Sequence, residues 1–531
     1  MKPEKDVITH KANRNLIDKQ LRISKPKEKF ESSFAAFSEK RPNSEVEWST
    51  RSGSPRAIQG TLSKPLPGTP SDVSRGFLVE NRDLFGIQED MRDLKEVDQI
   101  EWGGFQHVRY QQIYKGIPVF GGELLVASDA SNIVRLTAGS YFSDLEIAEE
   151  KKAVSKKKAI ETAMNDLGKD SRLRGEVTGD VVWYPTSRGF AKVYHLLIPA
   201  VNPLGDWRYA INVETQGIED SYNELRFATP IPMPMPMPTP IPMIVRKGTR
   251  GKVYLENPHE SVNLTTVMYR NLPFPYKYLA GTYTKILNED APEAVASSTG
   301  TFYYDPGNTH FDEAQMYYAV EKAYAYFSSL EFRGFTTKGR NGKMTSTVHV
   351  GNNYDNAYYS GSTGHIYFGD GSGPPSGLED LSKELDVVIH EFTHAVIDEY
   401  HPGINGSDGG ALHEGTADYF ACSLTNDSVL GEYVSPGPGG IRDANNTEKY
   451  PGSGGVHNRG KIWSGACWDL RKELGQSVAD YLVFGSMLLW PTTPTFKNAK
   501  DYLLSVDSTH CGGEYKNTIK KIFETERLIP V

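Results

Sequence analysis

The sequence has 531 residues, with 58 lysines and arginines against 67 aspartates and glutamates, which gives a net charge of −9. A chain of this length is expected to form several domains, and its 38% hydrophobic and 11% aromatic residues are enough for real cores. The acidic balance gives no reason to propose a nucleic-acid partner. No apolar run approaches the roughly 18 residues that a membrane-spanning helix needs, so no membrane span is predicted.

The three cysteines, Cys422, Cys467 and Cys511, show neither a close-spaced metal pattern nor a disulfide framework. One bridge with one thiol left over fits this count, and so do three unbridged residues.

Residues 1–50 are rich in Lys, Glu, Ser and Asn, with little periodicity, and are predicted to be a flexible leader. Residues 51–147 have a globular pattern. A helix is predicted over 73–83, followed by strands over 105–114, 117–120 and 123–127. Alternating polarity and the turn at Lys115-Gly116 predict a β-meander.

Residues 148–228 are predicted to form a second module of mixed helix and sheet. A basic helix over 153–167 precedes strands over 181–184, 191–198 and 207–213. This module contains no constellation of metal ligands or nucleophiles. His107 and His195 lie in strand patterns and are interpreted as structural.

Residues 229–245 form a linker that is rich in proline and methionine. Proline at nearly every second position excludes helix and sheet hydrogen bonds and predicts an extended polyproline II spacer. Beyond the linker, residues 246–384 are predicted to be rich in strands, with short strands over 346–350, 356–359 and 365–368. A helix over 312–330 carries an aromatic stripe that is typical of a core. Residues 385–531 are predicted to be mainly helical.

The stretch from Leu385 to Val396 carries the strongest functional pattern. Its apolar residues recur at the helical period and define one face. His390 and His394 are four residues apart, so they lie one turn apart on another face and can converge on one cation. Glu391 lies beside the first histidine, which suits a base acting on water at the metal. With 13 histidines in the chain, this pattern arises by chance only about 0.02 times.

A second helical pattern follows twenty residues later. Glu414 and Asp418 lie one turn apart on one face of it. Glu414 can supply a third ligand, and Asp418 can accept the free ring N–H of a ligating histidine. Two histidines, one glutamate and a water make a catalytic zinc site, because a structural site would close the fourth position with protein.

These segments resemble the thermolysin family of zinc metalloendopeptidases, which belong to the gluzincins. The resemblance implies that His390, His394 and Glu414 bind zinc and that Glu391 is the catalytic base. It also implies that Asp418 hydrogen-bonds a zinc-binding histidine without binding the metal itself. The phrase from His107 to Gln112, with Gly116 to Glu123, resembles the propeptide module of fungalysin and thermolysin precursors. Residues 148–228 resemble the second, PepSY-like propeptide module.

The same resemblance assigns further residues. Asn356 and Ala357, on an expected edge strand, would bind the substrate main chain. Arg442 would bind the substrate carbonyl, and His457, in a Gly-Gly-Val-His context, would stabilise the oxyanion. Asp386 matches a calcium-binding aspartate of the family.

Three positions depart from the family pattern. Gly452 stands where an aspartate usually orients the oxyanion histidine, and Asn405 stands where a tyrosine helps to hold the oxyanion. Thr425 replaces an expected glutamate of the double calcium site. These departures leave zinc hydrolysis intact but put full calcium loading in doubt.

The predicted protein is therefore an α+β multidomain zymogen. Two propeptide modules precede a thermolysin-like catalytic domain, with a β-rich lobe (246–384), a helical lobe (385–531) and the zinc site between them. Its expected cofactor is Zn²⁺, with Ca²⁺ as a further candidate. Its partners would be peptide or protein substrates and its own propeptide, which acts as chaperone and inhibitor, and the expected state is a monomer. The resemblance implies a secreted protein, although no secretory signal is visible near Met1. Two alternatives stay open: a catalytically weakened binding protein and a gluzincin aminopeptidase.

Overall fold

A computed structural model describes residues 27–531 except 50–51, 89–90, 144, 146–153, 169, 187–188, 202, 228–248, 262, 270, 273–276, 376 and 436–439. The chain forms two compact units. The first comprises residues 1–224 with 404–409 and 485–520, and the second comprises 225–403, 410–484 and 521–531. The first 26 residues of the predicted leader and the whole Pro/Met-rich linker lie outside the described residues.

The first unit opens with an antiparallel sheet in the order β3-β4-β5-β6-β2-β1. Its strands are β1 (Glu45–Trp48), β2 (Pro55–Gln59), β3 (Leu94–Trp102), β4 (Phe105–Tyr114), β5 (Ile117–Ser128) and β6 (Val134–Ser140). One face packs on α1 (Glu28–Glu39) and α2 (Pro70–Glu80), where Val108 and Tyr110 of β4 share a core with Phe37 and Phe77. Alternate residues of β4 therefore face these helices, as the period of a strand requires.

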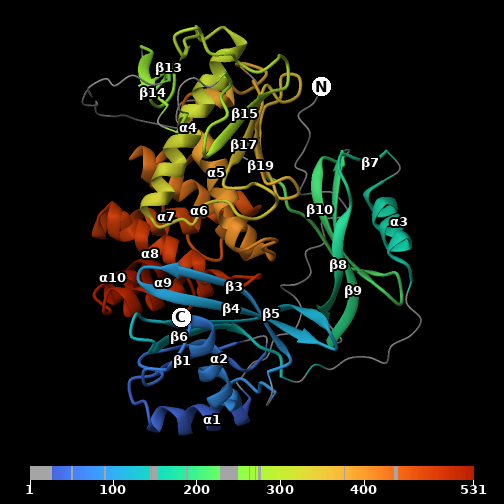
Figure 1. The fold of residues 1–531 in the computed structure, drawn as a ribbon, viewed down its shortest axis with the longest axis vertical. Coiled ribbons are helices and arrows are strands. Elements are labelled where there is room, and N and C mark those ends of the chain that lie inside the picture. The colour runs from blue at the N-terminus through green and yellow to red at the C-terminus, as the bar shows by residue number, and fades with distance from the viewer. Residues whose placement is uncertain are drawn as a thin grey trace. The chain divides into compact units, whose positions relative to one another are not determined.

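The opposite face of this sheet packs on α9 (Phe496–His510) and on the last residues of α8 (Gln476–Leu488), as Figure 1 shows. Arg109 of β4 donates to the Leu488 carbonyl at 3.0 Å. Arg56 of β2 forms a buried ion pair with Asp501 at 2.5 Å. Trp102 lies against Gly485, because a Cβ there would come within 2.4 Å of its ring. The sheet is thus held between two helical layers.

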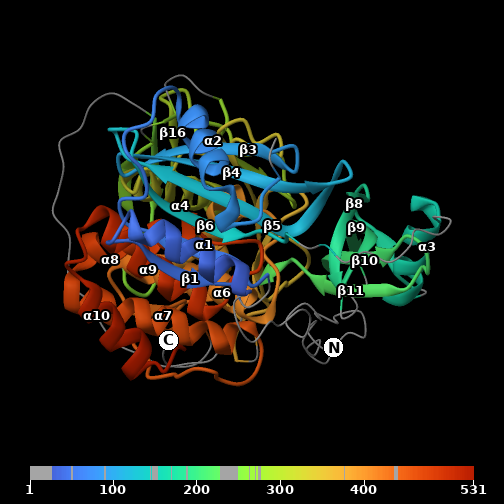
Figure 2. The same ribbon diagram turned by 90° about the horizontal axis from the view of Figure 1, so that it is seen from below.

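A second sheet in this unit contains β7 (Arg172–Leu173), β8 (Thr178–Thr186), β9 (Gly189–Val201), β10 (Gly205–Asn212) and β11 (Ile218–Asn223). Helix α3 (Lys156–Leu167) covers one face of it, and Figure 2 shows α3 beside β9 and β10. Ala159 and Ala163 of α3 pack there against Leu196, Trp207 and other buried side chains. A parallel pairing of Val119 with Trp183 joins the two sheets.

The second unit combines two sheets with the longer helices. One sheet has the order β12-β18-β19-β17-β15, from β12 (Arg226–Phe227), β15 (Thr284–Asn288), β17 (Met344–Val348), β18 (Ala357–Ser360) and β19 (His365–Phe368). A smaller sheet contains β13 (Arg250–Val253), β14 (Thr265–Met268) and β16 (Thr301–Phe302). The helices are α4 (Thr309–Ser329), α5 (Leu385–Tyr400), α6 (Ser407–Thr425), α7 (Val456–Leu474) and most of α8, with a π-helical turn at Lys521–Glu526.

The structure confirms a mixed fold of helices and sheets, with differences in detail. The predicted leader is wrong from residue 27 onward, because α1 and β1 form there and Phe30 and Phe37 are buried. The two predicted strands over 117–127 are one long strand, β5. The helix expected over 312–330 begins earlier, at Thr309. All three cysteines are unbridged.

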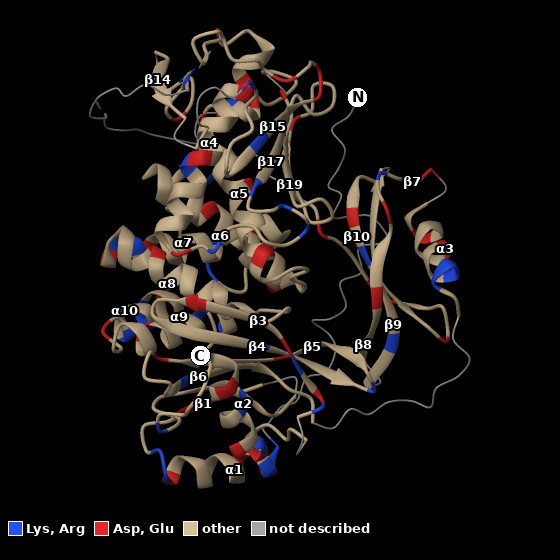
Figure 3. Ribbon diagram, viewed as in Figure 1, with Lys and Arg blue, Asp and Glu red and all other residues tan. Residues whose placement is uncertain are grey.

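Figure 3 shows basic and acidic residues interspersed along the ribbon in both units, as the nearly balanced counts suggest. Among the described residues, no helix is both long enough and apolar enough to cross a membrane.

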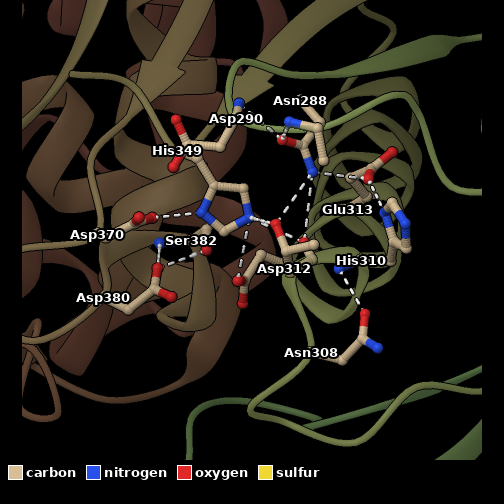
Figure 4. A network of polar contacts seen from close by, with 12 residues as sticks. Asn288, Asp290, Asn308, His310, Asp312, Glu313, His349, Asp370, Asp380 and Ser382 are labelled. Carbon is tan, nitrogen blue, oxygen red and sulfur yellow. Dashed lines mark hydrogen bonds and ion pairs between the residues drawn. The ribbon is translucent and has the colours of Figure 1, made fainter. Parts of the chain in front are cut away.

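A partly buried network of charges ties α4 to the segment before α5 (Figure 4). His349 Nδ1 lies 2.6 Å from Asp370, and its Nε2 lies 2.8 Å from the Thr309 carbonyl and 3.5 Å from Asp312. Lys383 bridges Asp312 and Asp380 at 3.3 and 2.9 Å. Burial by itself lowers the pKa of His349, but these partners outweigh it and raise the pKa to about 9.

This pKa predicts a loss of stability in mild alkali. A raised imidazole pKa contributes stability that is complete below about pH 6.5 and is lost as the pH rises through about 9. Because Asp370 is 36% exposed, screening should reduce the effect to on the order of 1 kcal/mol. The free energy of unfolding, measured between pH 6 and 9.5, should fall more for wild type than for His349→Asn. Asn tolerates the left-handed backbone at this position, where φ is 59°. Parallel pH profiles would contradict the prediction.

Candidate metal centre

Helix α5 carries the two predicted histidines, and its apolar face fixes their direction. The ring centroid of Phe392 lies 5.8 Å from that of Phe327 and 5.3 Å from that of Phe335. His390 and His394 lie on a different face and are completely buried. The hydrophobic period that predicted the helix therefore also determines where its histidines point.

Helices α6 and α7 bring the remaining polar groups to the same place. Glu414 and Asp418 lie on α6, and His457 lies in the first turn of α7. These two helices approach closely through small residues, because a Cβ on Gly415 would lie 2.3 Å from the Gly460 carbonyl. A larger residue at Gly415 would force α7, and His457 with it, away from Glu414.

Three ligand atoms, from His390, His394 and Glu414, lie within 4.8 Å of one another. The two histidine Nε2 atoms are 3.1 Å apart, and they lie 3.4 and 3.5 Å from Oε2 of Glu414. Oε2 is buried and makes no hydrogen bond to any described residue. Two imidazoles and a carboxylate are a ligand set that zinc prefers, so these residues fit the metal that the sequence predicts.

Glu391 and His457 border this cluster. Glu391 is completely buried, and neither of its carboxylate oxygens has a hydrogen-bond partner among the described residues. Burial raises its pKa to about 8, although the charge of His390 acts in the opposite direction. His457 Nε2 lies 3.3 Å from Oε2 of Glu414. The structure therefore brings five of the predicted residues together.

A second layer of charges surrounds the histidines. His390 Nδ1 lies 3.0 Å from Oδ1 of Asp418. Arg442 donates three hydrogen bonds to the two oxygens of Asp418, at 2.7–3.0 Å, and both side chains are buried. Burial by itself raises the pKa of Asp418, but the guanidinium and His390 outweigh it and hold that pKa below the usual range. Asp418 is thus an anion that lies between the Arg442 guanidinium and the His390 ring.

One contact of this site was not predicted from the sequence. His413 Nδ1 lies 2.7 Å from His394 Nδ1. The adjacency of His413 to Glu414 was the only available signal, and adjacent residues on a helix do not share a face.

The predicted substrate residues lie at strand β18. Ala357 begins the strand, and the Asn356 side chain accepts a hydrogen bond from the Ala357 amide at 3.0 Å. β19 pairs with one side of β18. β12 pairs antiparallel with the other side, with Arg226 opposite Tyr359 and Phe227 opposite Tyr358, so the expectation of an edge strand is wrong for the chain with β12 in place. The Tyr359 hydroxyl donates to Asp398 of α5 at 2.5 Å, which ties β18 to the histidine helix.

A second acidic cluster surrounds the predicted calcium residue. Ligand atoms of Glu384, Asp386 and Glu432 lie within 4.8 Å of one another. Oδ1 of Asp386 and Oε2 of Glu432 are buried without a hydrogen-bond partner among the described residues. Burial and the neighbouring carboxylates raise the pKa values of Glu384 and Asp386 well above the usual range. Glu384 and Glu432 were not found from the sequence, because isolated acidic residues carry no spacing signal.

The three departures from the family pattern have local explanations. Gly452 has φ of 66°, a backbone conformation that favours glycine over aspartate. Asn405, in the first unit, donates to the Tyr184 hydroxyl at 3.4 Å and lies 3.5 Å from Asp220. Thr425 donates its hydroxyl to the Ala421 carbonyl at 3.0 Å.

Comparison with known proteins finds relatives for two parts of the chain. The family model of the thermolysin metallopeptidase catalytic domain matches residues 245–398, and that of the fungalysin/thermolysin propeptide motif matches residues 92–141. Bacillolysin of Brevibacillus brevis is 26% identical over 466 residues, which cover 81% of each chain. Thermolysin of Bacillus caldolyticus is 24% identical over 433 residues, covering 76% of this chain and 75% of that protein.

A solved structure of the protealysin precursor from Serratia proteamaculans covers 49% of this chain and 95% of its own, with 17% identity and a TM-score of 0.38. That score is too low to define the fold.

The class defined by these findings is a metalloendopeptidase, a hydrolase of peptide bonds. More narrowly, the chain is a thermolysin-like metalloprotease precursor that carries a propeptide motif.

Proposed function

We propose that the protein is a zymogen whose catalytic domain cuts peptide bonds with the help of zinc held by His390, His394 and Glu414. The observation that carries this proposal is the convergence of three ligand atoms on one point, with Oε2 of Glu414 left without a hydrogen bond among the described residues. A bound zinc ion would polarise the scissile carbonyl and make a nearby water more acidic.

The other residues supply proton transfer and charge stabilisation. Glu391 takes the proton of the attacking water and passes it to the leaving amine. Its buried oxygens have no competing partner among the described residues, which supports that role. His457 donates a hydrogen bond to the developing oxyanion, a contribution of about 2.7–4 kcal/mol where such donors have been removed. Asp418 orients His390.

Substrate would bind along the edge of the sheet. A free strand edge pairs with the backbone of an extended peptide whatever its sequence. Ala357 begins the strand that would offer this edge, and Asn356 immediately precedes it. We assign the substrate carbonyl to Arg442, whose guanidinium is a planar group of N–H donors held in place by Asp418.

The test is hydrolysis of an N-terminally blocked peptide by the zinc-loaded protein after removal of the pro-region. Cleavage inside the peptide is expected. An aminopeptidase would need a free amino terminus and would leave the blocked peptide intact. Zinc binding without cleavage of any peptide would favour the binding-protein alternative.

The pro-region would block the substrate edge until it is removed. β12, which ends at Phe227, occupies the side of β18 that does not pair with β19. A peptide could not pair with β18 from that side while β12 remains there. This arrangement supports an inhibitory role for the end of the second predicted propeptide module, which includes β12. Export from the cell is part of the same proposal, because thermolysin-like precursors are expected to be secreted.

The first sheet would also act as a folding template for α8 and α9, the chaperone role expected of a propeptide. Gly485→Ala in the full chain should destabilise the first unit by about 1–3 kcal/mol, because the new Cβ would lie 2.4 Å from the Trp102 ring. Trp102→Ala removes that clash. The cost of Gly485→Ala, measured by chemical denaturation in both backgrounds, should therefore be smaller when Trp102 is absent. Equal costs in the two backgrounds would contradict the predicted contact.

We also propose that Asp386, with Glu384 and Glu432, holds a calcium ion. Hard cations favour carboxylate oxygens, and two of these oxygens are buried without partners among the described residues. Burial and mutual repulsion raise the pKa values of Glu384 and Asp386, and a bound cation would offset both effects.

Calcium at about one hundred times its dissociation constant should stabilise the protein by about 2.7 kcal/mol. The unfolding temperature should therefore rise with calcium at constant zinc content and fall with a calcium-selective chelator. Asp386→Asn should lose this response, and a calcium-independent unfolding temperature in wild type would exclude the site.

A further inference from the structure

The two histidines of the proposed zinc site have different partners at their Nδ1 atoms. His390 is backed by the carboxylate of Asp418, which Arg442 neutralises. His394 is backed by a second imidazole, that of His413, at 2.7 Å between the two Nδ1 atoms. His413 is only 4% exposed, and its ring centroid lies 4.7 Å from that of His394.

We propose that His413 is a positioning residue for the metal centre, which accepts the Nδ1–H of His394 and so holds that ring in the metal-binding tautomer. The inference rests on the proposed zinc site. Its basis is the 2.7 Å contact, which is short enough for one strong N–H···N hydrogen bond but leaves room for only one proton.

The tautomer follows from the direction in which His394 faces Glu414. Its Nε2 lies 3.5 Å from the Glu414 carboxylate and 3.1 Å from His390 Nε2, at the point where the three ligand atoms meet. A nitrogen that binds a metal must offer a lone pair there, so the ring proton has to reside on Nδ1. His413 Nδ1 must then be the acceptor, and its own proton must lie on Nε2.

Helix α6 helps to position two of the proposed zinc ligands, Glu414 and His394. His413 immediately precedes Glu414 on α6, whereas His394 lies on α5. One turn of α6 therefore supplies both the third ligand and the acceptor that orients the second ligand. Because the acceptor is neutral, His394 should be less electron-rich than His390, whose acceptor carries a full charge.

The experiment compares zinc affinity in variants of the full chain that also carry Glu391→Gln, so that self-cleavage does not interfere. His413→Leu fills a similar volume but offers no hydrogen-bond acceptor. Zinc binding, measured by chelator competition, should therefore weaken about 10–100-fold. His413→Asn offers an amide oxygen and should stay within about threefold of the parent. His365→Leu, a change at a half-buried histidine of β19, serves as the control and should leave the affinity unchanged.

A measurement on the parent protein avoids any dependence on how the variants fold. With ¹⁵N-labelled histidine and bound zinc, His394 should show a protonated Nδ1 that exchanges slowly with water, and His413 an unprotonated Nδ1. A protonated Nδ1 on His413, or equal zinc affinities of the Leu and Asn variants, would overturn this inference alone. A parent that binds no zinc would overturn it together with the proposed function.

Discussion

Replacing Glu391 with Gln should reduce peptide hydrolysis by a factor of about 10²–10⁴, because an amide cannot take the proton of the attacking water. Zinc content should not change, since Glu391 is not among the three converging ligands. The side chain is completely buried, and Gln keeps its shape and volume, so the fold should tolerate the substitution.

The measurement is kcat/KM on a blocked peptide, with zinc determined on the same samples. Glu289→Gln makes the same chemical change at an exposed site and should leave both quantities unchanged. Retained activity in Glu391→Gln would show that another group is the base, whereas loss of zinc together with activity would place Glu391 among the ligands.

Replacing Asp418 with Leu is expected to have two separable effects. Arg442 is 5% exposed and donates three hydrogen bonds to the Asp418 carboxylate, so its charge would be left buried and unpaired. Breaking a buried pair in this way costs about 3–5 kcal/mol of stability. His390 would also lose the carboxylate 3.0 Å from its Nδ1, which should weaken zinc binding about 10–100-fold.

The double variant Asp418→Leu/Arg442→Met separates these effects. Removing both charges should restore most of the lost free energy of unfolding, because no buried ion is left without its partner. Zinc affinity should stay low, because nothing then orients His390. Recovery of zinc affinity in the double variant would contradict the orienting role of Asp418.

The features that could be predicted from the sequence are those with a short period or a fixed spacing. The apolar face of α5 placed His390 and His394 together, and a spacing of one helical turn related Glu414 to Asp418. Long alternating strands such as β4 were also predictable, because one face of them is buried. The meeting of His457 with Glu414 was expected only from family resemblance, because it depends on how closely Gly415 and Gly460 let two helices approach.

The features that were missed depend on tertiary packing. The segment over 28–48 has a polar composition, yet two of its four aromatic residues, Phe30 and Phe37, are buried and hold α1 in place. Glu384, Glu432 and His413 take their importance from neighbours that are distant in the sequence or on another helix. The pairing of β12 with β18 joins residues more than a hundred positions apart, and a two-residue strand leaves no periodic signal.

The most direct test of the account is zinc X-ray absorption spectroscopy on the Glu391→Gln protein, with metal stoichiometry measured in parallel. We expect one zinc per chain, bound by two imidazole nitrogens, one carboxylate and at least one solvent oxygen, and loss of this spectrum in Glu414→Ala. A zinc ion enclosed by four protein ligands, or a protein that binds no zinc, would contradict it.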